Sequence, residues 1–195
     1  IGGGVNATIS LSGSGLNLDL SALGGGNISG IEILDLNGQG ANTLTLDEDT
    51  LSDMEADTLT VNGDSSDTVE LTGPGWTYVS SSVDYHTYTD ENGKTLNISV
   101  DVNHTVKGSS GNDTIIDPGR ANVILEGAAG SDTFIVKPVS GTEIKPDDFS
   151  EIRGGTGMDR IALQGSGLTL DFTTGGWGGN GISGVEILDI SSGAS

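Results

Sequence analysis

The feature that most constrains this chain is a regular recurrence of short segments in which apolar and polar residues alternate. Every second segment lies 24 to 26 residues further along. Alternation with a period of two is typical of a half-buried β-strand. A coil of two strands, stacked on its neighbours, explains both periods, so the sequence predicts an all-β chain that forms a parallel β-solenoid or β-roll. The segments centre near Ile9, Leu18, Ile33, Leu44, Leu59 and Val69.

The alternation also predicts which side chains face the core. An antiparallel sandwich with regular turns would show the same alternation and stays open as an alternative. The near-constant length of the coil favours the solenoid. The residues expected to point inward are Leu16, Leu18, Leu20, Leu44, Leu46, Leu59, Val61, Val69 and Leu71.

Two segments interrupt the period. Residues 50–57 are typical of a turn of helix, with Thr50 or Ser52 as its cap. Residues 76–106 contain Asn92-Gly93 between alternating segments, which is a strong signal for a β-hairpin. We therefore expect an inserted antiparallel hairpin or a three-stranded meander in this region.

A longer repeat also runs through the chain. Residues 2–20 resemble residues 154–172 at an offset of 152, and residues 28–36 return as 182–190 at an offset of 154. Such a pattern is typical of a piece of a tandem array, in which neighbouring copies of the repeat are partners. In the isolated chain, residues 182–190 would contact residues 2–20 of a neighbour. The expected organisation is solenoid coils over 1–75, an antiparallel hairpin insertion over 76–106, a β-roll over 107–152 and the start of a second copy over 153–195.

The second half of the chain contains a nine-residue repeat: GSSGNDTII, GAAGSDTFI and GGTGMDRIA, with NGDSSDTVE as a degraded copy in the first half. The glycines permit a tight loop, and the Asp at position six supplies a carboxylate. Two such loops on one edge of the roll would surround a calcium ion with about six oxygen ligands. The candidate metal-binding residues are Gly108, Gly111 and Asp113, then Gly127, Gly130 and Asp132, then Gly155, Gly157 and Asp159, and finally Asp67 in the degraded copy.

The spacing of these loops favours one pair. Asp113 and Asp132 are 19 residues apart, which is two nonapeptides plus one inserted residue, so the leading candidate site lies between their loops. Asp159 follows Asp132 after 27 residues, so its partner stays open, and Asp67 is isolated by the hairpin insertion. The alternative is that the loops are glycine turns in which each Asp bonds only to the local backbone.

Charge and composition agree with binding of a hard cation. The 195 residues include 28 Asp and Glu against 7 Lys and Arg, which gives a net charge of −21, and residues 1–93 carry fifteen acids and no base. This charge excludes binding to nucleic acid or to an anionic membrane surface. No apolar run is long enough for membrane insertion, and the absence of cysteine excludes thiolate metal sites.

The nonapeptides resemble the calcium-binding repeats of the RTX (repeat-in-toxin) family. The segments GLNLDLS, ISGIEILDLNGQGANTLTL and VNGDSSDTVELTGPGW resemble modules of giant RTX adhesins that type I secretion exports. The resemblance implies Ca²⁺ as cofactor, a secreted or cell-surface location and a structural, spacing role in an adhesin. We do not expect an enzyme, because the chain has two histidines and neither an HExxH nor a GxSxG motif.

Two other functions stay open at this point. The repeat would suit a self-assembling subunit of an extracellular filament or S-layer. Alternatively, a cluster of aromatic residues near the hairpin would stack on a surface glycan or a peptide. The competing interpretation is that these rings pair across strands and cover the core. The candidate ligand-binding residues are Trp76, Tyr78, Tyr85 and Tyr88.

Overall fold

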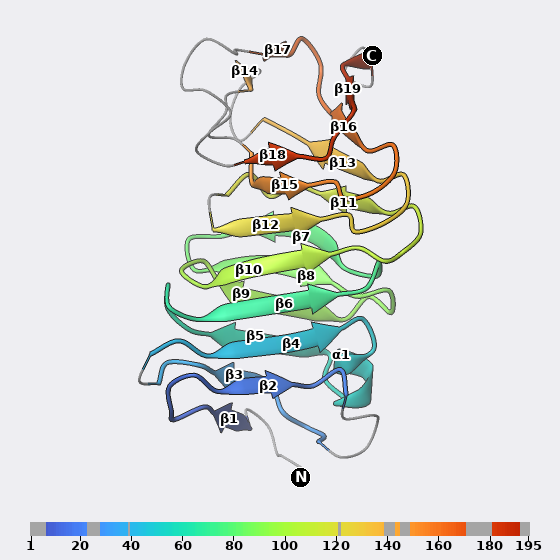
Figure 1. Ribbon diagram of the computed structural model, residues 1–195. Helices are drawn as coiled ribbons and strands as arrows, with labels where there is room; N and C mark the ends of the chain where they lie inside the picture. Colours follow the sequence, from blue (N-terminus) through green and yellow to red (C-terminus); the bar gives the residue numbers. More distant parts are fainter. Residues whose placement is uncertain are drawn as a thin grey trace. The chain divides into compact units, whose positions relative to one another are not determined.

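The computed structural model describes residues 7–22, 28–38, 40–120, 122–138, 143–144, 149–170 and 181–191. Parts of the two repeat copies, residues 2–6, 171–180 and 192–195 among them, lie outside these ranges. The chain divides into two compact units, Ile1–Thr105 and Val106–Ser195. The described residues are nearly all in strands or in the connections between them (Figure 1), so the all-β prediction is confirmed. No helix in the described ranges is long and apolar enough to cross a membrane.

Unit 1 contains two parallel sheets. Successive strands alternate between the sheets: β1 pairs with β3 and β3 with β5, while β2 pairs with β4 and β4 with β6. All of these pairs are parallel, so the antiparallel sandwich is wrong for this part of the chain. We call one strand from each sheet, with its connections, a coil. The strands are β1 (Thr8–Ser10), β2 (Asn17–Asp19), β3 (Ile33–Asp35), β4 (Thr43–Asp47), β5 (Thr58–Asn62) and β6 (Thr68–Thr72).

The inward-facing positions of these strands form the core of unit 1, as the alternation predicts. Leu16 is the exception, since 41 % of its surface is exposed. It precedes β2, the last strand of its sheet, so no further coil covers it in the described residues. The predicted core residues that are buried are Leu20, Leu44, Leu46, Leu59, Val61, Val69 and Leu71.

A short helix, α1 (Thr50–Asp53), follows β4 as expected, but its predicted cap is wrong. Asp49 occupies the N-cap position, in place of Thr50 or Ser52, and its side chain makes no capping hydrogen bond. Thr50 instead bonds back to the end of β4: its Oγ1 donates to Asp47 Oδ1 at 2.6 Å and accepts the Asp47 N–H at 3.0 Å. The hydroxyl is therefore used to tie the helix to the strand.

The inserted segment is a three-stranded antiparallel meander, as predicted. β7 (Thr77–Ser81) pairs with β8 (Tyr85–Thr89), and β8 pairs with β9 (Thr95–Ser99). β9 then pairs in parallel with β5, so the meander extends the first sheet of unit 1.

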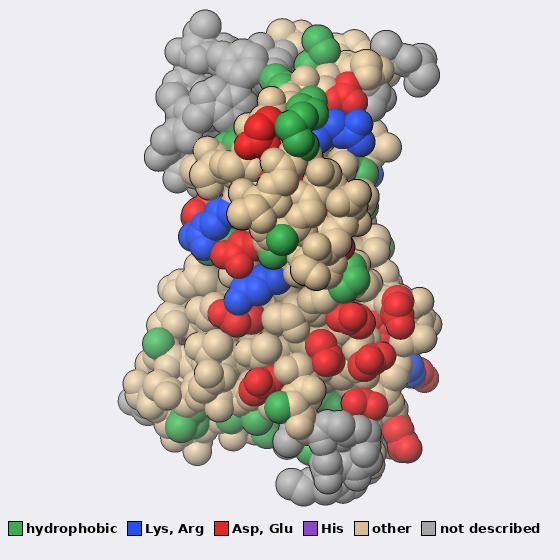
Figure 2. Space-filling model, turned by 45° about the vertical axis from the view of Figure 1, so that its right-hand side comes forward, with side chains coloured by type: hydrophobic (Ala, Val, Ile, Leu, Met, Phe, Trp, Pro, Cys, Tyr) green, Lys and Arg blue, Asp and Glu red, His purple; other side chains and the backbone are tan. Residues whose placement is uncertain are grey.

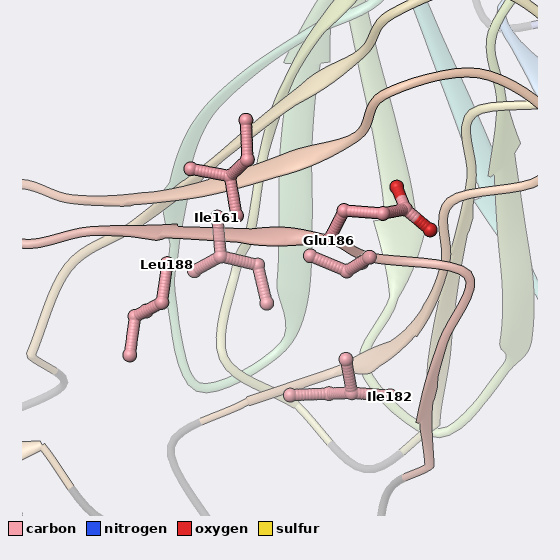
Figure 3. Close-up of a pocket in the computed structure, with 6 residues that line it drawn as sticks. Ile161, Ile182, Glu186 and Leu188 are labelled. Atoms are coloured by element: carbon pink, nitrogen blue, oxygen red, sulfur yellow. The ribbon is translucent and has the colours of Figure 1, made fainter.

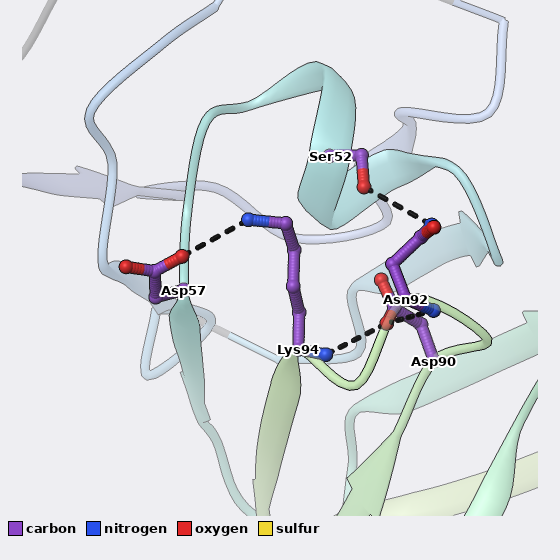
Figure 4. A network of polar contacts seen from close by, with 5 residues as sticks. All are labelled: Ser52, Asp57, Asp90, Asn92 and Lys94. Atoms are coloured by element: carbon purple, nitrogen blue, oxygen red, sulfur yellow. Dashed lines mark hydrogen bonds and ion pairs between the residues drawn. The ribbon is translucent and has the colours of Figure 1, made fainter.

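The turn between β8 and β9 is held by polar contacts (Figure 4). Asp90 Oδ1 accepts the N–H groups of Asn92 at 2.9 Å and of Lys94 at 2.8 Å. Asn92 Nδ2 donates to Ser52 Oγ at 3.2 Å, and Lys94 Nζ pairs with Asp57 Oδ1 at 3.0 Å. These contacts connect the turn to α1 and to the residue that precedes β5.

Unit 2 also contains two parallel sheets and a third, two-stranded one. β10 (Asn103–Lys107) lies where the sequence passes from unit 1 to unit 2. One sheet of unit 2 contains β12 (Val123–Glu126), β15 (Glu151–Arg153) and β18 (Ile182–Ser183), and the other contains β11 (Thr114–Ile116), β13 (Thr133–Val136), β16 (Arg160–Leu163) and β19 (Ile187–Asp189). The short strands β14 (Glu143–Ile144) and β17 (Thr169–Leu170) pair with each other.

Candidate metal centre

Three glycine-rich loops of unit 2 lie on the same edge, at residues 108–113, 127–132 and 154–159. Each loop leads into one strand of the β11–β13–β16 sheet, where Thr114 lies opposite Thr133 and Thr133 lies opposite Arg160. The Asp at position six of each loop therefore occupies the same place in three successive coils. The structure thus brings Asp159 next to Asp132, whose partner the sequence left open, because the longer coil takes up its extra residues between β13 and β15.

The three carboxylates form a ladder with the main chain of successive coils. The N–H of Asp113 donates to Asp132 Oδ1 at 2.8 Å, and the N–H of Asp132 donates to Asp159 Oδ1 at 2.8 Å. The N–H of Asp159 continues the series by donating to Glu186 Oε2 at 2.9 Å. Asp113, Asp132 and Asp159 are all buried. Each of the two inner carboxylates therefore uses one oxygen to satisfy an amide of the preceding coil.

The second oxygen of two of these carboxylates is buried without a hydrogen bond. Among the described residues, Asp132 Oδ2 and Asp159 Oδ2 have no hydrogen-bond partner. An unsatisfied buried polar group costs about 1–3 kcal/mol, and a charged one costs more. Asp113 differs, because its Oδ2 accepts the N–H of Ser109 at 2.6 Å. The inner two carboxylates are therefore the places where a cation would stabilise the loops most.

Burial raises the pKa of Asp132. The N–H of Asp113 opposes this shift, while the nearby carboxylates of Asp159 and Asp113 add to it. With a raised pKa, the folded chain holds the proton more tightly than the unfolded chain. Asp132 therefore stabilises the fold at acidic pH and loses that contribution as the pH rises through its raised pKa. A cation bound beside Asp132 would have the opposite effect, because it favours the ionised carboxylate.

Glycine at the first position of each loop makes room for the carboxylate. A Cβ on Gly108 would lie 2.6 Å from Asp113 Oδ2 and 2.8 Å from the carbonyl oxygen of Gly127. The same arrangement recurs one coil later, where a Cβ on Gly127 would meet Asp132 Oδ2 and the carbonyl oxygen of Gly154. A carboxylate oxygen and a carbonyl oxygen from the next coil thus face the same space. Both are ligand types that Ca²⁺ uses in proteins.

The remaining predicted glycines lie where one loop stacks on the next. A Cβ on Gly130 would meet the carbonyl oxygen of Gly111, and one on Gly157 would meet that of Gly130. Gly155 stands in the same relation to the carbonyl oxygen of Ala128. The loop carbonyl groups therefore point along the stack towards the following coil.

Asp67 lies in unit 1 and has a different environment from the stacked loops. Its Oδ1 accepts the N–H of Asn42 at 3.0 Å, and its Oδ2 accepts the N–H of Asp64 at 3.0 Å. Asn42 Oδ1 in turn accepts the N–H of Leu16 at 3.1 Å. Asp67 and Asn42 thus form a separate ladder in unit 1, and these hydrogen bonds account for the buried Asp67 carboxylate without a metal ion.

Several ladder residues were missed by the sequence analysis. Glu186 follows Asp159 by 27 residues, as Asp159 follows Asp132, and it accepts the Asp159 N–H. Glu32 follows Ala7 by 25 residues, and its Oε2 accepts the Ala7 N–H at 2.7 Å. Polar side chains that recur at the length of one coil are the signal that would have identified them.

The four aromatic residues proposed to bind a ligand lie in unit 1, where two of them are buried. Trp76 and Tyr88 are 4 % and 1 % exposed, so neither presents a ring face to solvent. The ring of Tyr78 meets that of Tyr88 edge-on at a centroid distance of 5.6 Å. Tyr88 Oη lies 2.8 Å from His104 Nε2. Tyr85 is half-buried. Packing between neighbouring strands accounts for this cluster.

His104 is part of this interior and is held neutral. Burial lowers the pKa of His104 to about 3, and the nearby His86 contributes to the shift. A neutral imidazole accepts or donates a hydrogen bond without a charge to bury. The cluster is therefore uncharged at His104 over the whole physiological pH range.

No group of three or more His, Cys, Asp or Glu side chains within the described residues is placed to hold a metal ion. A cation at the stacked loops would therefore take many of its ligands from main-chain carbonyl groups. Comparisons with family models, with curated proteins and with solved structures found no match for the chain. The functional interpretation accordingly depends on the geometry of the loops.

Proposed function

We propose that this chain is a calcium-stabilised β-solenoid that acts as a structural spacer in a secreted, cell-surface adhesin of the RTX type. The observation that carries the proposal is the pair of buried carboxylate oxygens, Asp132 Oδ2 and Asp159 Oδ2, that have no hydrogen-bond partner in the described residues. The parallel pairing of successive coils supports the solenoid. The adhesin assignment rests on the resemblance of the nonapeptides and the outer repeat.

The calcium ions would lie between successive loops of the stack, at residues 108–113, 127–132 and 154–159. Each site would combine an Asp carboxylate with carbonyl oxygens from two coils, a mixture that suits the six to eight oxygen ligands of Ca²⁺. Asp132 and Asp159 are the strongest candidates, because their Oδ2 atoms gain a partner on binding. Asp67 is not included, because both of its oxygens already accept hydrogen bonds.

Calcium would couple the folding of this chain to its location. Fifteen acids without a base in residues 1–93 repel one another in a compact state, as the acidic face of unit 1 in Figure 2 illustrates. Where calcium is scarce, this repulsion and the unpaired carboxylates favour the unfolded chain, which a secretion channel can pass. Outside the cell, the free energy of calcium binding adds to the free energy of folding.

The proposed role is mechanical and involves no catalysis. Main-chain hydrogen bonds between parallel strands join each coil to the next within each unit. A stack of such coils keeps a fixed spacing per repeat, which suits a module that holds a binding domain away from a cell surface. Neighbouring copies of the same repeat are the partners that this role requires.

Calorimetric titration with calcium tests the proposal. We expect saturable binding with a dissociation constant of about 10⁻⁴–10⁻³ M, the range of extracellular calcium modules. Magnesium at the same concentrations should bind far more weakly, because Mg²⁺ demands a small octahedral site and gives up its water reluctantly. Equal binding of both ions, or no binding of calcium, would show that the loops are only glycine turns.

A further inference from the structure

The last strands of unit 2 repeat the arrangement of the first strands of unit 1. Arg160 lies opposite Ile187 in the β16–β19 pair, and Thr8 lies opposite Ile33 in the β1–β3 pair. The repeat offsets of 152 and 154 relate these two pairs residue by residue. β16 therefore corresponds to β1, and β19 corresponds to β3.

The hydrogen bonds around the two pairs also correspond. Glu32 Oε2 accepts the Ala7 N–H at 2.7 Å, and Glu186 Oε2 accepts the Asp159 N–H at 2.9 Å. The N–H of Ile33 donates to the carbonyl oxygen of Ala7 at 3.2 Å. Its counterpart, the N–H of Ile187, donates to the carbonyl oxygen of Asp159 at 3.0 Å. The second copy thus folds as the first does, down to single contacts.

The two copies differ in what covers them. In unit 1, β5 pairs with the outer edge of β3, placing Val61 opposite Leu34, and Leu34 and Leu36 are each 1 % exposed. In unit 2, β19 is the last strand of its sheet in the described residues. The counterparts of those two leucines, Leu188 and Ile190, are 42 % and 69 % exposed.

The surface around β19 is a shallow apolar hollow of about 300 Å³. Figure 3 shows the labelled side chains of Ile161, Ile182 and Leu188 around it, with the carboxylate of Glu186 beside them. Val185 and Ile187 complete its lining. An exposed strand edge next to an apolar surface is a site for pairing with a further strand.

We propose that the outer edge of β19 binds a further copy of the β5 segment, Thr58–Asn62, supplied by another copy of this repeat. The strand would run parallel to β19, with Leu188 opposite the new Val61 and Asp189 opposite the new Asn62, as Leu34 and Asp35 lie in unit 1. This inference rests on the proposed tandem array and adds the contacting strand and its register.

The same correspondence excludes β1 of a neighbouring molecule as the natural occupant, although the sequence predicted that contact. The counterpart of β1 is β16, and the strand on the other side of β16 from β19 is β13, with Phe134 opposite Ile161. The repeat therefore places a strand of the β13 type against β1. A contact between β19 and β1 would reproduce neither pairing.

Thiol labelling of an extended chain tests the inference. The protein has no cysteine, so Leu188→Cys introduces a single reactive group. In the extended chain, residues 42–105 follow Ser195 directly, which continues the offset of 154. With calcium present, we expect the extended chain to react about 20-fold or more slowly than the original chain, because local opening must precede labelling. Equal rates in the two chains would overturn the inference.

Three controls separate the possible causes. Leu34→Cys should react slowly in both chains, which shows that unit 1 is folded, and Val83→Cys, at a position 88 % exposed, should react fast in both. An extension that starts one residue later turns the new strand's side chains to the other face and should leave Leu188→Cys reactive. Slower labelling of the original chain at higher protein concentration would instead identify a second molecule as the occupant and overturn the proposed one.

A second readout needs no substitution at the site. The N–H of Leu36 donates to the carbonyl oxygen of Asn62 at 2.8 Å, so hydrogen exchange at its counterpart, Ile190, should slow in the extended chain. Unchanged exchange at Ile190 would count against the pairing. Both readouts follow the strand edge and not the metal, so a protected Leu188→Cys without calcium binding would refute the proposed function and leave this inference standing.

Discussion

Removing calcium with EDTA is expected to lower the midpoint of thermal unfolding by about 10–20 °C. Two sites, each saturated at about 100 times its dissociation constant, would contribute about 5 kcal/mol to the free energy of unfolding. For a chain of this size, each kcal/mol shifts the midpoint by about 2–4 °C. Circular dichroism of the β-sheet signal during heating, in 10-fold excess of chelator and then in excess calcium, measures the shift.

The control for this experiment is non-specific screening of the net charge of −21. Any salt reduces the repulsion between exposed carboxylates, and a divalent ion does so more strongly. Magnesium chloride at the same ionic strength should therefore recover only a small part of the lost stability. An unfolding midpoint that is the same in chelator and in calcium would mean that the acidic loops need no cation.

The substitution Asp132→Asn is expected to have opposite effects without and with calcium. In chelator, Asn keeps an oxygen for the N–H of Asp113 and removes a buried charge that faces the carboxylates of Asp113 and Asp159. The variant should therefore unfold at the same temperature as the parent chain or a few degrees higher. In calcium, the variant lacks a charged ligand, so we expect it to lose at least half of the calcium-dependent gain.

The matched control is Asp67→Asn. The Asn oxygen can still accept the N–H of Asn42, but its NH₂ group cannot accept the N–H of Asp64, which Asp67 Oδ2 accepts at 3.0 Å. Losing that hydrogen bond should cost about 1–3 kcal/mol both with and without calcium. The calcium-dependent gain should stay as in the parent chain. Equal losses of calcium response in the two variants would show that the assignment of the site to unit 2 is wrong.

The arrangement of strands followed from the sequence because it is written in a pattern that any residue can show. Alternation marks each strand, and a nearly constant coil length of 24 to 26 residues places every second strand in the same sheet. The meander was equally visible, since Asn92-Gly93 specifies a tight turn. Leu16 was placed wrongly, because alternation marks which face a side chain occupies and not whether another coil covers that face.

The loops were found by their glycines, but their environment was not. Asp159 stayed without a partner because the 27-residue coil hides its extra residues between two strands, away from the loop edge. The ladder was invisible for another reason: the partner of each carboxylate is a main-chain N–H of the preceding coil. Such a partner has no residue type, so no sequence pattern records it.

Crystals grown in about 10 mM calcium would test the central claim most directly, through the anomalous scattering of the metal. We predict anomalous peaks between the loops at residues 127–132 and 154–159, at about 2.3–2.6 Å from Asp132 Oδ2 or Asp159 Oδ2, with carbonyl oxygens completing the ligand shell. Loops without an anomalous peak, with both Oδ2 atoms bonded instead to water or to main-chain N–H groups, would contradict calcium binding at this edge.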